Sequence, residues 1–166
     1  MSTENKYNEE AKKKIKELTE EIETSMMVTA LGKSPLQAVP MTQKKIDMHG
    51  DIWFLSPGDS DHNQNIAKNK EVQLLYSDPS SKKFLSVFAE AEIVVEQSIL
   101  EELYSSISDN WFDGTNDPNL TALKITPKEA YYWDTKTNKL VSLFKMGVGA
   151  VTGKKADVGE KGKLSV

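Results

Sequence analysis

The succession of short strand-like segments constrains the fold of this chain more than any other feature. Each segment has the length and the β-branched or aromatic content of a strand, and polar turns separate them. These segments are residues 26–31, 36–42, 51–56, 71–77, 83–95, 120–126, 129–134 and 139–144, the last two predicted to form a hairpin through residues 135–138. In the longest segment the alternation shifts near Ala89, which indicates a bulge or a bend.

Helical patterns are confined to three regions. Residues 8–25 carry apolar residues at Ala11, Ile15, Leu18 and Ile22, a spacing typical of an amphipathic helix laid on a sheet. Short helices are predicted at residues 61–69 and 98–108, the second opened by a capping box of Ser98 and Glu101. Many short strands with few helices predict a mainly β fold, a small antiparallel β-barrel with flanking α-helices at its rim.

Composition excludes several classes of function. The 166 residues contain no cysteine and two histidines, so disulfides, thiolate chemistry and a histidine-rich metal site are not expected. A net charge of −4 argues against a nucleic-acid partner. No apolar run reaches the roughly 18 residues that span a bilayer, and residues 1–6 lack the apolar core of a secretory signal. We therefore expect a cytoplasmic protein with no membrane and no nucleic-acid partner.

All 21 basic residues are lysines. Because arginine supplies the planar fork that binds phosphate in a bidentate way, any phosphate here must be held by lysines, hydroxyls and backbone N–H groups. Redox chemistry would require a bound cofactor, since the side chains present do not provide it.

Two neighbouring strand-like segments favour a site for a flat, phosphorylated ligand. Pro40 removes a backbone donor from residues 36–42, so we expect irregular pairing there and backbone groups free to bind a ligand. The segment 51–56 ends at Ser56, whose hydroxyl we place at the mouth of a turn. His62 opens the next short helix, where an anion is favoured, and with Ser56 it is a candidate phosphate contact or else an ordinary surface residue.

Other motifs have a structural interpretation beside the functional one. Asp113 and Asp117 are expected to bond nearby backbone N–H groups rather than act as an acid–base pair. Trp53 and Trp133 lie within strands and are expected in the core, whereas Trp111 lies in a loop and is equally consistent with packing or with ligand contact. Residues 147–153 resemble a dinucleotide loop but have the wrong spacing.

Several stretches, taken together, resemble one known family. They are Met27-Val-Thr29, Ala38-Val-Pro-Met41, Gly50-Asp-Ile-Trp-Phe54, Phe84-Leu-Ser-Val-Phe-Ala-Glu-Ala91, Asn110-Trp-Phe-Asp-Gly-Thr-Asn-Asp-Pro-Asn119 and Tyr131-Tyr-Trp-Asp134. The last two are the most specific. Over about residues 10–146 the chain resembles the general stress proteins of the pyridoxamine 5′-phosphate oxidase-like group, the FMN-binding split barrels.

The resemblance implies a six-stranded antiparallel split β-barrel, and a homodimer with flavin sites at the subunit interface. It places the isoalloxazine edge of FMN near the backbone of Val39, Pro40, Met41 and Thr42. It also implies that Phe54, Leu55 and Ser56 flank the path of the ribityl phosphate, with His62 near the phosphate and Trp111 approaching the ring from the partner subunit. On this basis residues 1–146 form the flavin-binding domain, and residues 147–166 form a Gly/Lys-rich tail with little to bury.

The chain departs from the family where phosphate is held. Family members commonly have arginine at the position of Val39 and lysine at that of His62, and each hydrogen bond to a charged group contributes about 1.5–3 kcal/mol. Lys68, Lys82 and Lys83 are the candidates to compensate. Three alternatives therefore stand. The first is a flavoprotein with FMN, which is either an oxidoreductase of unknown substrate or not an enzyme. The second is a non-enzymatic barrel that keeps the dimer, has lost FMN affinity, and binds another flat ligand or acts through protein contacts. The third is a protein that binds a different flavin, such as FAD. Pyridoxamine-phosphate oxidation itself is not expected without arginine.

Overall fold

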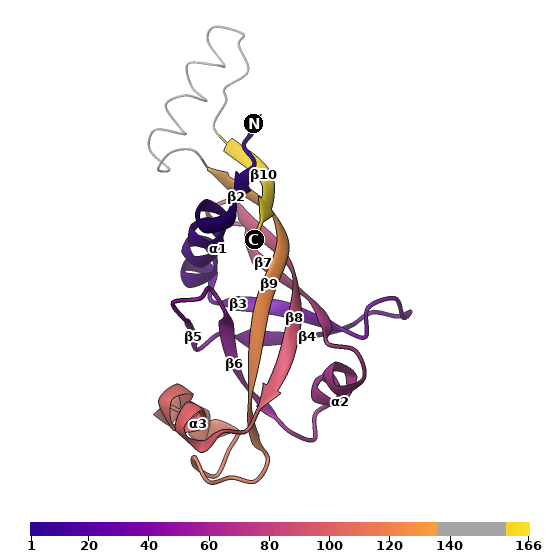
Figure 1. The fold of residues 1–166 in the computed structure, drawn as a ribbon, viewed down its shortest axis with the longest axis vertical. Coiled ribbons are helices and arrows are strands. Elements are labelled where there is room, and N and C mark those ends of the chain that lie inside the picture. Colours follow the sequence, from indigo (N-terminus) through magenta and orange to yellow (C-terminus); the bar gives the residue numbers. More distant parts are fainter. Residues whose placement is uncertain (136–158) are drawn as a thin grey trace, which may run out of the picture.

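The computed structural model describes residues 1–135 and 159–166, and in this part the protein is mainly β (Figure 1). The strands are β1 (Ser2–Thr3), β2 (Lys6–Tyr7), β3 (Thr24–Thr29), β4 (Gln37–Thr42), β5 (Lys45–Ile46), β6 (Ile52–Pro57), β7 (Glu71–Asp78), β8 (Lys83–Val94), β9 (Leu120–Thr135) and β10 (Gly159–Ser165). The helices are α1 (Asn8–Ile22), α2 (Asp61–Lys68), α3 (Gln97–Leu103) and the 3₁₀-helix η1 (Ser106–Asn110). None of the helices in these residues is long and apolar enough to cross a bilayer.

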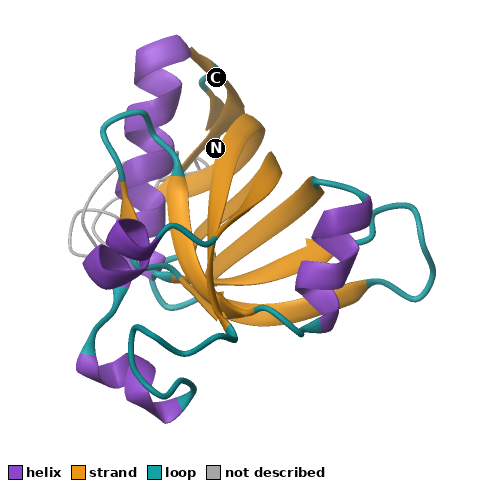
Figure 2. Ribbon diagram, turned by 60° about the horizontal axis from the view of Figure 1, so that its bottom comes forward, coloured by secondary structure: helices purple, strands orange, loops and turns teal. Residues whose placement is uncertain are grey.

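The strands form one sheet that curls on itself (Figure 2). Its main order is β1-β10-β9-β8-β7-β3-β4, with β2 also on β10, β6 also on β9, and β5 on β6. The pairings are antiparallel except that β1 and β2 run parallel to β10. The expected count of six antiparallel strands is therefore corrected to a mixed sheet of ten strands in the described residues. The additional strands are β1, β2 and β10 from the two ends of the chain and the two-residue strand β5.

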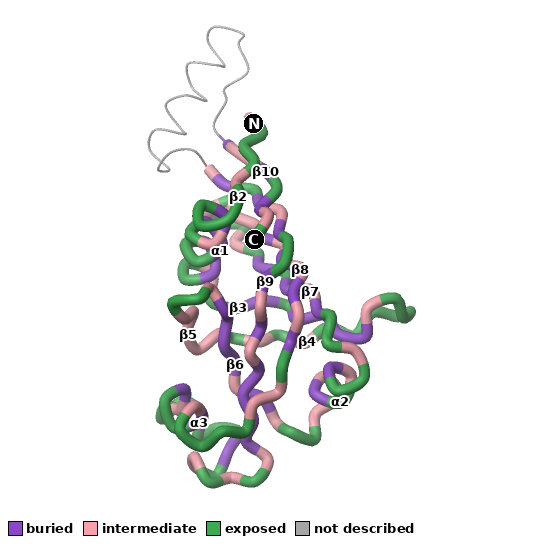
Figure 3. Tube along the Cα trace, in the orientation of Figure 1, coloured by how far each residue is buried: buried purple, intermediate pink, exposed green. Residues whose placement is uncertain are grey.

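The predicted amphipathic helix is confirmed as α1. Ala11, Ile15 and Leu18 are buried in the main core, which the inner faces of the strands complete. A second, smaller apolar cluster lies where α3 packs against β6 and β9, and it includes Trp53 and Phe112. Figure 3 shows buried residues along the central strands, whereas α2 and α3 contain many exposed residues.

The predicted bend near Ala89 is confirmed. The pairing of β8 with β9 shifts between Phe88 and Ala89, where Phe88 pairs with Glu129 but Ala89 pairs with Pro127. Lys128 is the extra residue on β9. Because proline cannot donate to a ladder, a bulge beside Pro127 lets one strand continue through it. The two segments predicted at 120–126 and 129–134 are consequently one strand, β9.

Two predictions about the helix expected at residues 98–108 are wrong, namely its capping box and its end. Ser98 and Glu101 do not form a capping box: α3 begins after Glu96 without a side-chain cap, and it ends at Leu103. A capping box is instead formed by Ser105 and Ser108 at the start of η1. Ser98 and Glu101 match the usual rule of Ser or Thr followed three residues later by Glu or Gln, whereas the box that forms has Ser108 in the place of the Glu or Gln.

The expectation of a tail with little to bury is also corrected. Residues 159–165 form β10, which pairs with β9 along its whole length, and Leu164 is fully buried in the main core. The end of the chain thus belongs to the same sheet as the predicted 1–146 domain. The strand predicted at 139–144, its turn, and the glycine motif at 147–153 lie outside the described residues.

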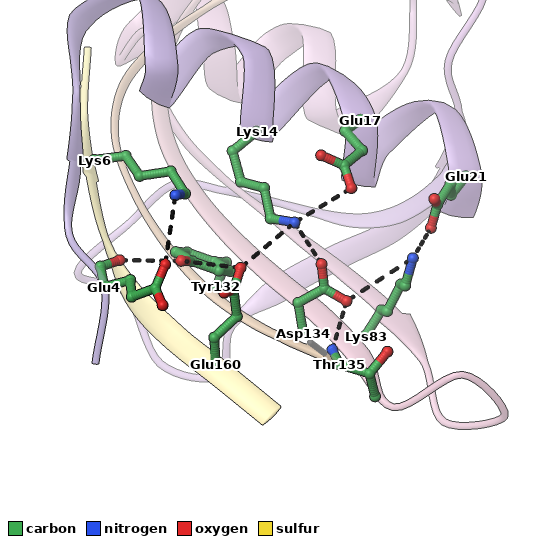
Figure 4. A network of polar contacts seen from close by, with 10 residues as sticks. All are labelled: Glu4, Lys6, Lys14, Glu17, Glu21, Lys83, Tyr132, Asp134, Thr135 and Glu160. Carbon is green, nitrogen blue, oxygen red and sulfur yellow. Dashed lines mark hydrogen bonds and ion pairs between the residues drawn. The ribbon is translucent and has the colours of Figure 1, made fainter. Parts of the chain in front are cut away.

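A buried cluster of charges holds the two ends of the chain against α1 (Figure 4). The ammonium group of Lys14 bonds the Asp134 carboxylate, and it lies 3.3 Å from Glu17 and 3.8 Å from Glu160. Lys83 joins Glu21 to Asp134, and Tyr132 donates to the carbonyl oxygen of Glu4. The cluster therefore links α1 with β8, β9, β10 and the segment between β1 and β2.

Gly162 permits the close approach of this N-terminal segment to β10. A Cβ atom at Gly162 would lie 1.8 Å from the carbonyl oxygen of Glu4 and 2.5 Å from its carbonyl carbon. We expect Gly162→Ala to displace residues 1–7 and to reduce the free energy of unfolding by about 1–3 kcal/mol, because backbone atoms cannot rotate aside. Urea denaturation measures the energy, and hydrogen exchange of the amides of β1 and β2 measures the displacement.

The control for Gly162→Ala is Gly58→Ala, where the nearest atom to a new Cβ is the Thr121 methyl at 3.2 Å. This variant should change the unfolding energy less and leave the exchange of residues 1–7 unaffected. Unchanged protection of the N-terminal amides in Gly162→Ala would contradict the close packing of Glu4 on β10.

Candidate functional site

Strand β4 forms an edge of the sheet and carries four of the predicted site residues. It pairs with β3 in unbroken register from Thr24–Thr42 to Thr29–Gln37, and with no other strand of the described residues. The expectation that Pro40 interrupts this ladder is therefore wrong, because an edge strand tolerates proline without losing its register. Val39 and Met41 pack against the main core, while Pro40 and Thr42 are exposed. The free backbone row is the outer edge of β4.

The three predicted site residues of β6 differ in how far they are buried. Phe54 and Ser56 are fully buried, Phe54 within the main core, whereas Leu55 is half-buried against the second cluster. The expectation of a Ser56 hydroxyl open at the mouth of a turn is therefore wrong. Of the three side chains, that of Leu55 is the one with exposed surface.

Ser56 and His62 do meet, as the sequence suggested. Ser56 Oγ lies 2.6 Å from Nε2 of His62 and donates to Oδ1 of Asn63 at 2.7 Å. Nδ2 of Asn63 donates to Oγ1 of Thr121 at 2.9 Å, and this hydroxyl donates to the carbonyl oxygen of Ser56 at 2.7 Å. A buried serine whose hydrogen is directed at an amide oxygen is not an activated nucleophile. Ser56, held by Asn63, therefore fixes the position of the half-buried His62 ring.

Helix α2 is attached to the β4 edge by a separate contact. Nδ2 of Asn65 donates to Oγ1 of Thr29 at 3.0 Å and also to Oε1 of Gln37, the first residue of β4. The N-cap of the helix is Ser60, whose hydroxyl accepts from the Asn63 amide. The edge with Val39–Thr42 and the helix with His62 are consequently two sides of one region.

Trp111 directly follows η1 as its C-cap residue and is 68% exposed. Its amide donates to the carbonyl oxygen of Ser108. Lys44, two residues beyond β4, donates to the hydroxyls of Ser105 and Ser108 at 3.0 and 3.1 Å. Burial lowers the pKa of this ammonium group. The turn that carries Trp111 is thus tied to the end of the same edge strand.

The remaining sequence candidates have structural roles. Asp117 accepts from the amides of Asp113 and Asn119, and these bonds lower its pKa, as expected of a turn former. Trp53 is buried as predicted, but Trp133 is 36% exposed and lies 4.8 Å from the Tyr131 ring on the outer face of the sheet. The expectation of Trp133 in the core is wrong because β9 has opposite faces, and residue 133 lies on the outer one.

The sequence did not identify four residues of this region, which are Asn63, Asn65, Thr121 and Lys44. Asn63 and Thr121, which complete the Ser56 cluster, are 58 positions apart, and no local pattern relates them. Lys44 adjoins the proline-containing segment, and its position shortly after Thr42 was the one available signal. Lys83, considered as a compensating cation, is engaged by Glu21 and Asp134 instead.

All the elements of this region lie within the part of the chain that matches one known protein family. The family described as pyridoxamine 5′-phosphate oxidase like matches residues 10–157. The chain belongs to this family. The match includes the edge strand, α2 and the turn with Trp111, and it extends past the expected boundary at residue 146. Among curated proteins none matches the chain.

Several solved structures have a fold similar to that of this chain. A protein described as general stress protein 26 from Jannaschia sp. CCS1 has a TM-score of 0.78 at 21% identity, covering 95% of this chain and 98% of that one. One related to general stress protein 26, from Clostridium acetobutylicum, has a TM-score of 0.65 at 21% identity, covering 76% and 90%. The general stress FMN/FAD binding protein of Xanthomonas citri has a TM-score of 0.66 at 22% identity, covering 79% and 93%.

Proposed function

We propose that this protein is a cytoplasmic, flavin-binding general stress protein whose curled sheet serves as a split barrel, with FMN as the preferred ligand. The observation that carries the proposal is the outer edge of β4, which no strand of residues 1–135 or 159–166 pairs with and which lies beside α2 in a chain of the oxidase-like family. Backbone donors at such an edge suit the carbonyl and nitrogen atoms along one side of an isoalloxazine ring. The flavin would supply electron transfer, and the protein would bind and orient it.

In this proposal Val39, Pro40, Met41 and Thr42 contact the ring edge through their backbone. Leu55 borders the ribityl chain, and Phe54 and Ser56 support that border from within the protein. His62, held by Ser56, contacts the phosphate. One fold relative, from Xanthomonas citri, is described as binding FMN or FAD, so FAD is the second ligand to test.

The deciding experiment is a titration of purified protein with FMN, followed by the quenching of flavin fluorescence. FAD and riboflavin are titrated in parallel. Saturable binding of equimolar FMN per chain supports the proposal, and preferential binding of FAD replaces FMN by FAD. Failure to bind any of the three overturns it.

A non-enzymatic barrel without flavin is the second candidate. The absence of arginine, with Val39 and His62 at positions where the family commonly has cations, favours it. Asp59 and Asp61 at the start of α2 add negative charge where a phosphate would bind. In that case the protein acts through contacts with other proteins, and the titration shows no binding.

Trp111 provides a specific prediction for the flavin site. We expect Trp111→Ala to weaken FMN binding by roughly two- to twelvefold, because an aromatic contact contributes about 0.5–1.5 kcal/mol beyond its buried area. Its exposed side chain makes the same variant nearly neutral for stability. Ile107→Ala, 65% exposed on the same turn, is the control and should leave FMN affinity unchanged. Equal affinities of wild type and Trp111→Ala would remove Trp111 from the site.

We further propose a homodimer with the flavin sites at its interface. A row of paired residues that is apolar except for Ser86 crosses the outer face of the sheet, where Pro40 pairs with Met26, Met26 with Leu75, Leu75 with Ser86, and Ser86 with Tyr131. Met26 and Leu75 are 42% and 43% exposed. The contiguous apolar part of this row, formed by Pro40, Met26 and Leu75, suits a self-complementary contact between two copies.

Light scattering tests the dimer, for which we expect twice 18.6 kDa. Met26→Lys should reduce the measured mass to that of one chain, because a lysine between Pro40 and Leu75 would bury an unpaired charge in the contact. Met48→Lys, at a turn residue that is 93% exposed, is the control and should remain dimeric. A dimer that persists in Met26→Lys would mean that another surface forms the contact.

A further inference from the structure

The polar chain behind His62 determines which nitrogen of its ring carries hydrogen. The carbonyl oxygen of Ser56 can only accept, so the hydroxyl hydrogen of Thr121 is directed to it, at 2.7 Å. Thr121 must then accept from Nδ2 of Asn63, which turns Oδ1 of Asn63 toward Ser56. The Ser56 hydrogen goes to that Oδ1 at 2.7 Å. Ser56 Oγ therefore accepts from His62, and Nε2 of His62 is the protonated nitrogen.

This assignment leaves Nδ1 as the nitrogen that titrates. Within the described residues Nδ1 of His62 forms no hydrogen bond, since the ring's bond is made by Nε2. A second proton can join Nδ1 without disturbing the contact with Ser56, so the ring changes charge while its position stays fixed. At neutral pH the free Nδ1 accepts hydrogen bonds, and after protonation it donates one.

The charges around the ring disfavour an anion while His62 is neutral. Burial lowers the pKa of His62, whereas the neighbouring Asp61 raises it less strongly. Strands β6 and β9 present the neutral Ser56 and Thr121, and the preceding turn contributes Asp59, whose carboxylate accepts from Asn119. A phosphate beside Asp61 would therefore gain most when Nδ1 takes up a proton.

We propose that His62 makes phosphate binding at this site proton-linked, so that a flavin with a phosphate is bound more tightly as the pH falls, while one without it is not. This inference rests on the proposed flavin site. A bound phosphate raises the pKa of the imidazole, and a group whose pKa is raised on binding takes up a proton. The affinity for FMN is then lowest when the pH is above the pKa of His62 in the complex. It increases as the pH falls toward the pKa of His62 in the free protein.

The test compares FMN with riboflavin, which lacks the phosphate, between pH 8.5 and 6.5. We expect FMN affinity of the wild type to increase roughly three- to tenfold over this range and riboflavin affinity to stay flat. His62→Lys, with a permanent cation, should bind FMN tightly at all these pH values. His62→Gln, with none, should bind it weakly at all of them.

Nitrogen NMR of the two histidines tests the proton assignment without any flavin. At pH 7.5 the His62 ring should show the Nε2–H form. The variant His49→Gln removes the other histidine, so the remaining signal is that of His62. A Nδ1–H form, or FMN binding with a flat pH profile in the wild type, overturns the inference and leaves the flavin site standing. No FMN binding by wild type or by His62→Lys at any pH overturns the proposed function and the linkage with it.

Discussion

Asp134→Ala should cost this protein about 3–5 kcal/mol of unfolding free energy, the largest effect we expect from any single charge removal. The Asp134 side chain is 4% exposed and bonds the ammonium group of Lys14, whose side chain is 9% exposed. Its other oxygen accepts from the Thr135 amide and lies 3.8 Å from Lys83. Removal leaves Lys14 buried with Glu17 and Glu160 as its remaining partners. These two acids place the expected cost toward the lower end of the range.

The pH dependence gives this prediction a second measurement. Burial lowers the pKa of Lys14, but the hydrogen bond and charge of Asp134, with those of Glu17, outweigh it and raise the pKa above 10.5. A raised pKa in the folded state means that the stabilisation is complete below the lysine value and is lost as the pH rises through the folded value. The difference in unfolding energy between wild type and Asp134→Ala should therefore be constant near neutrality and shrink above about pH 10.5.

Two comparison variants separate a broken buried pair from general damage. Glu20→Ala removes an acid that lies 3.8 Å from Lys16 at the exposed face of α1, and should cost no more than about 1 kcal/mol. The double variant Lys14→Met with Asp134→Leu should recover most of the loss, because apolar residues can replace a buried pair. If Asp134→Ala unfolds at the same urea concentration as Glu20→Ala, the buried pair is not formed in solution.

Leu164→Ala should reduce the unfolding energy by about 2–5 kcal/mol, the usual cost of truncating a fully buried leucine. Leu164 has no exposed surface, belongs to the main core, and pairs with Ala130 of β9 and Lys6 of β2. The midpoint of urea denaturation should fall while its slope stays the same. The measurement decides whether the last strand stabilises the domain.

Val166→Ala is the matched control for Leu164→Ala, since Val166 follows β10 and is 38% exposed. Its unfolding energy should remain within about 0.5 kcal/mol of the wild type. A Leu164→Ala variant as stable as this control would show that β10 does not contribute to the core, and would restore the expectation of a tail without a packing role.

The proposed flavin site combines residues that local sequence patterns identify with residues that they do not. The segment Val39–Thr42, His62 and Trp111 were all proposed from their neighbours in the sequence. The contacts that join them came from Asn65, Lys44 and Thr121, which are polar residues of ordinary appearance. A hydrogen-bonding partner far along the chain leaves no periodic trace, so such residues are found only when the strands are placed.

The sequence by itself determined the mainly β class, the amphipathic α1 with Ala11, Ile15 and Leu18, and the bulge near Ala89. Each of these follows from spacing within a dozen residues, where helix and strand periods differ. The tertiary structure decided that Pro40 lies on a regular edge, that Ser56 is buried, and that residues 159–165 enter the sheet. These features depend on pairing between distant segments, as Lys14 and Asp134 show across 120 positions, and local periodicity carries no information about such partners.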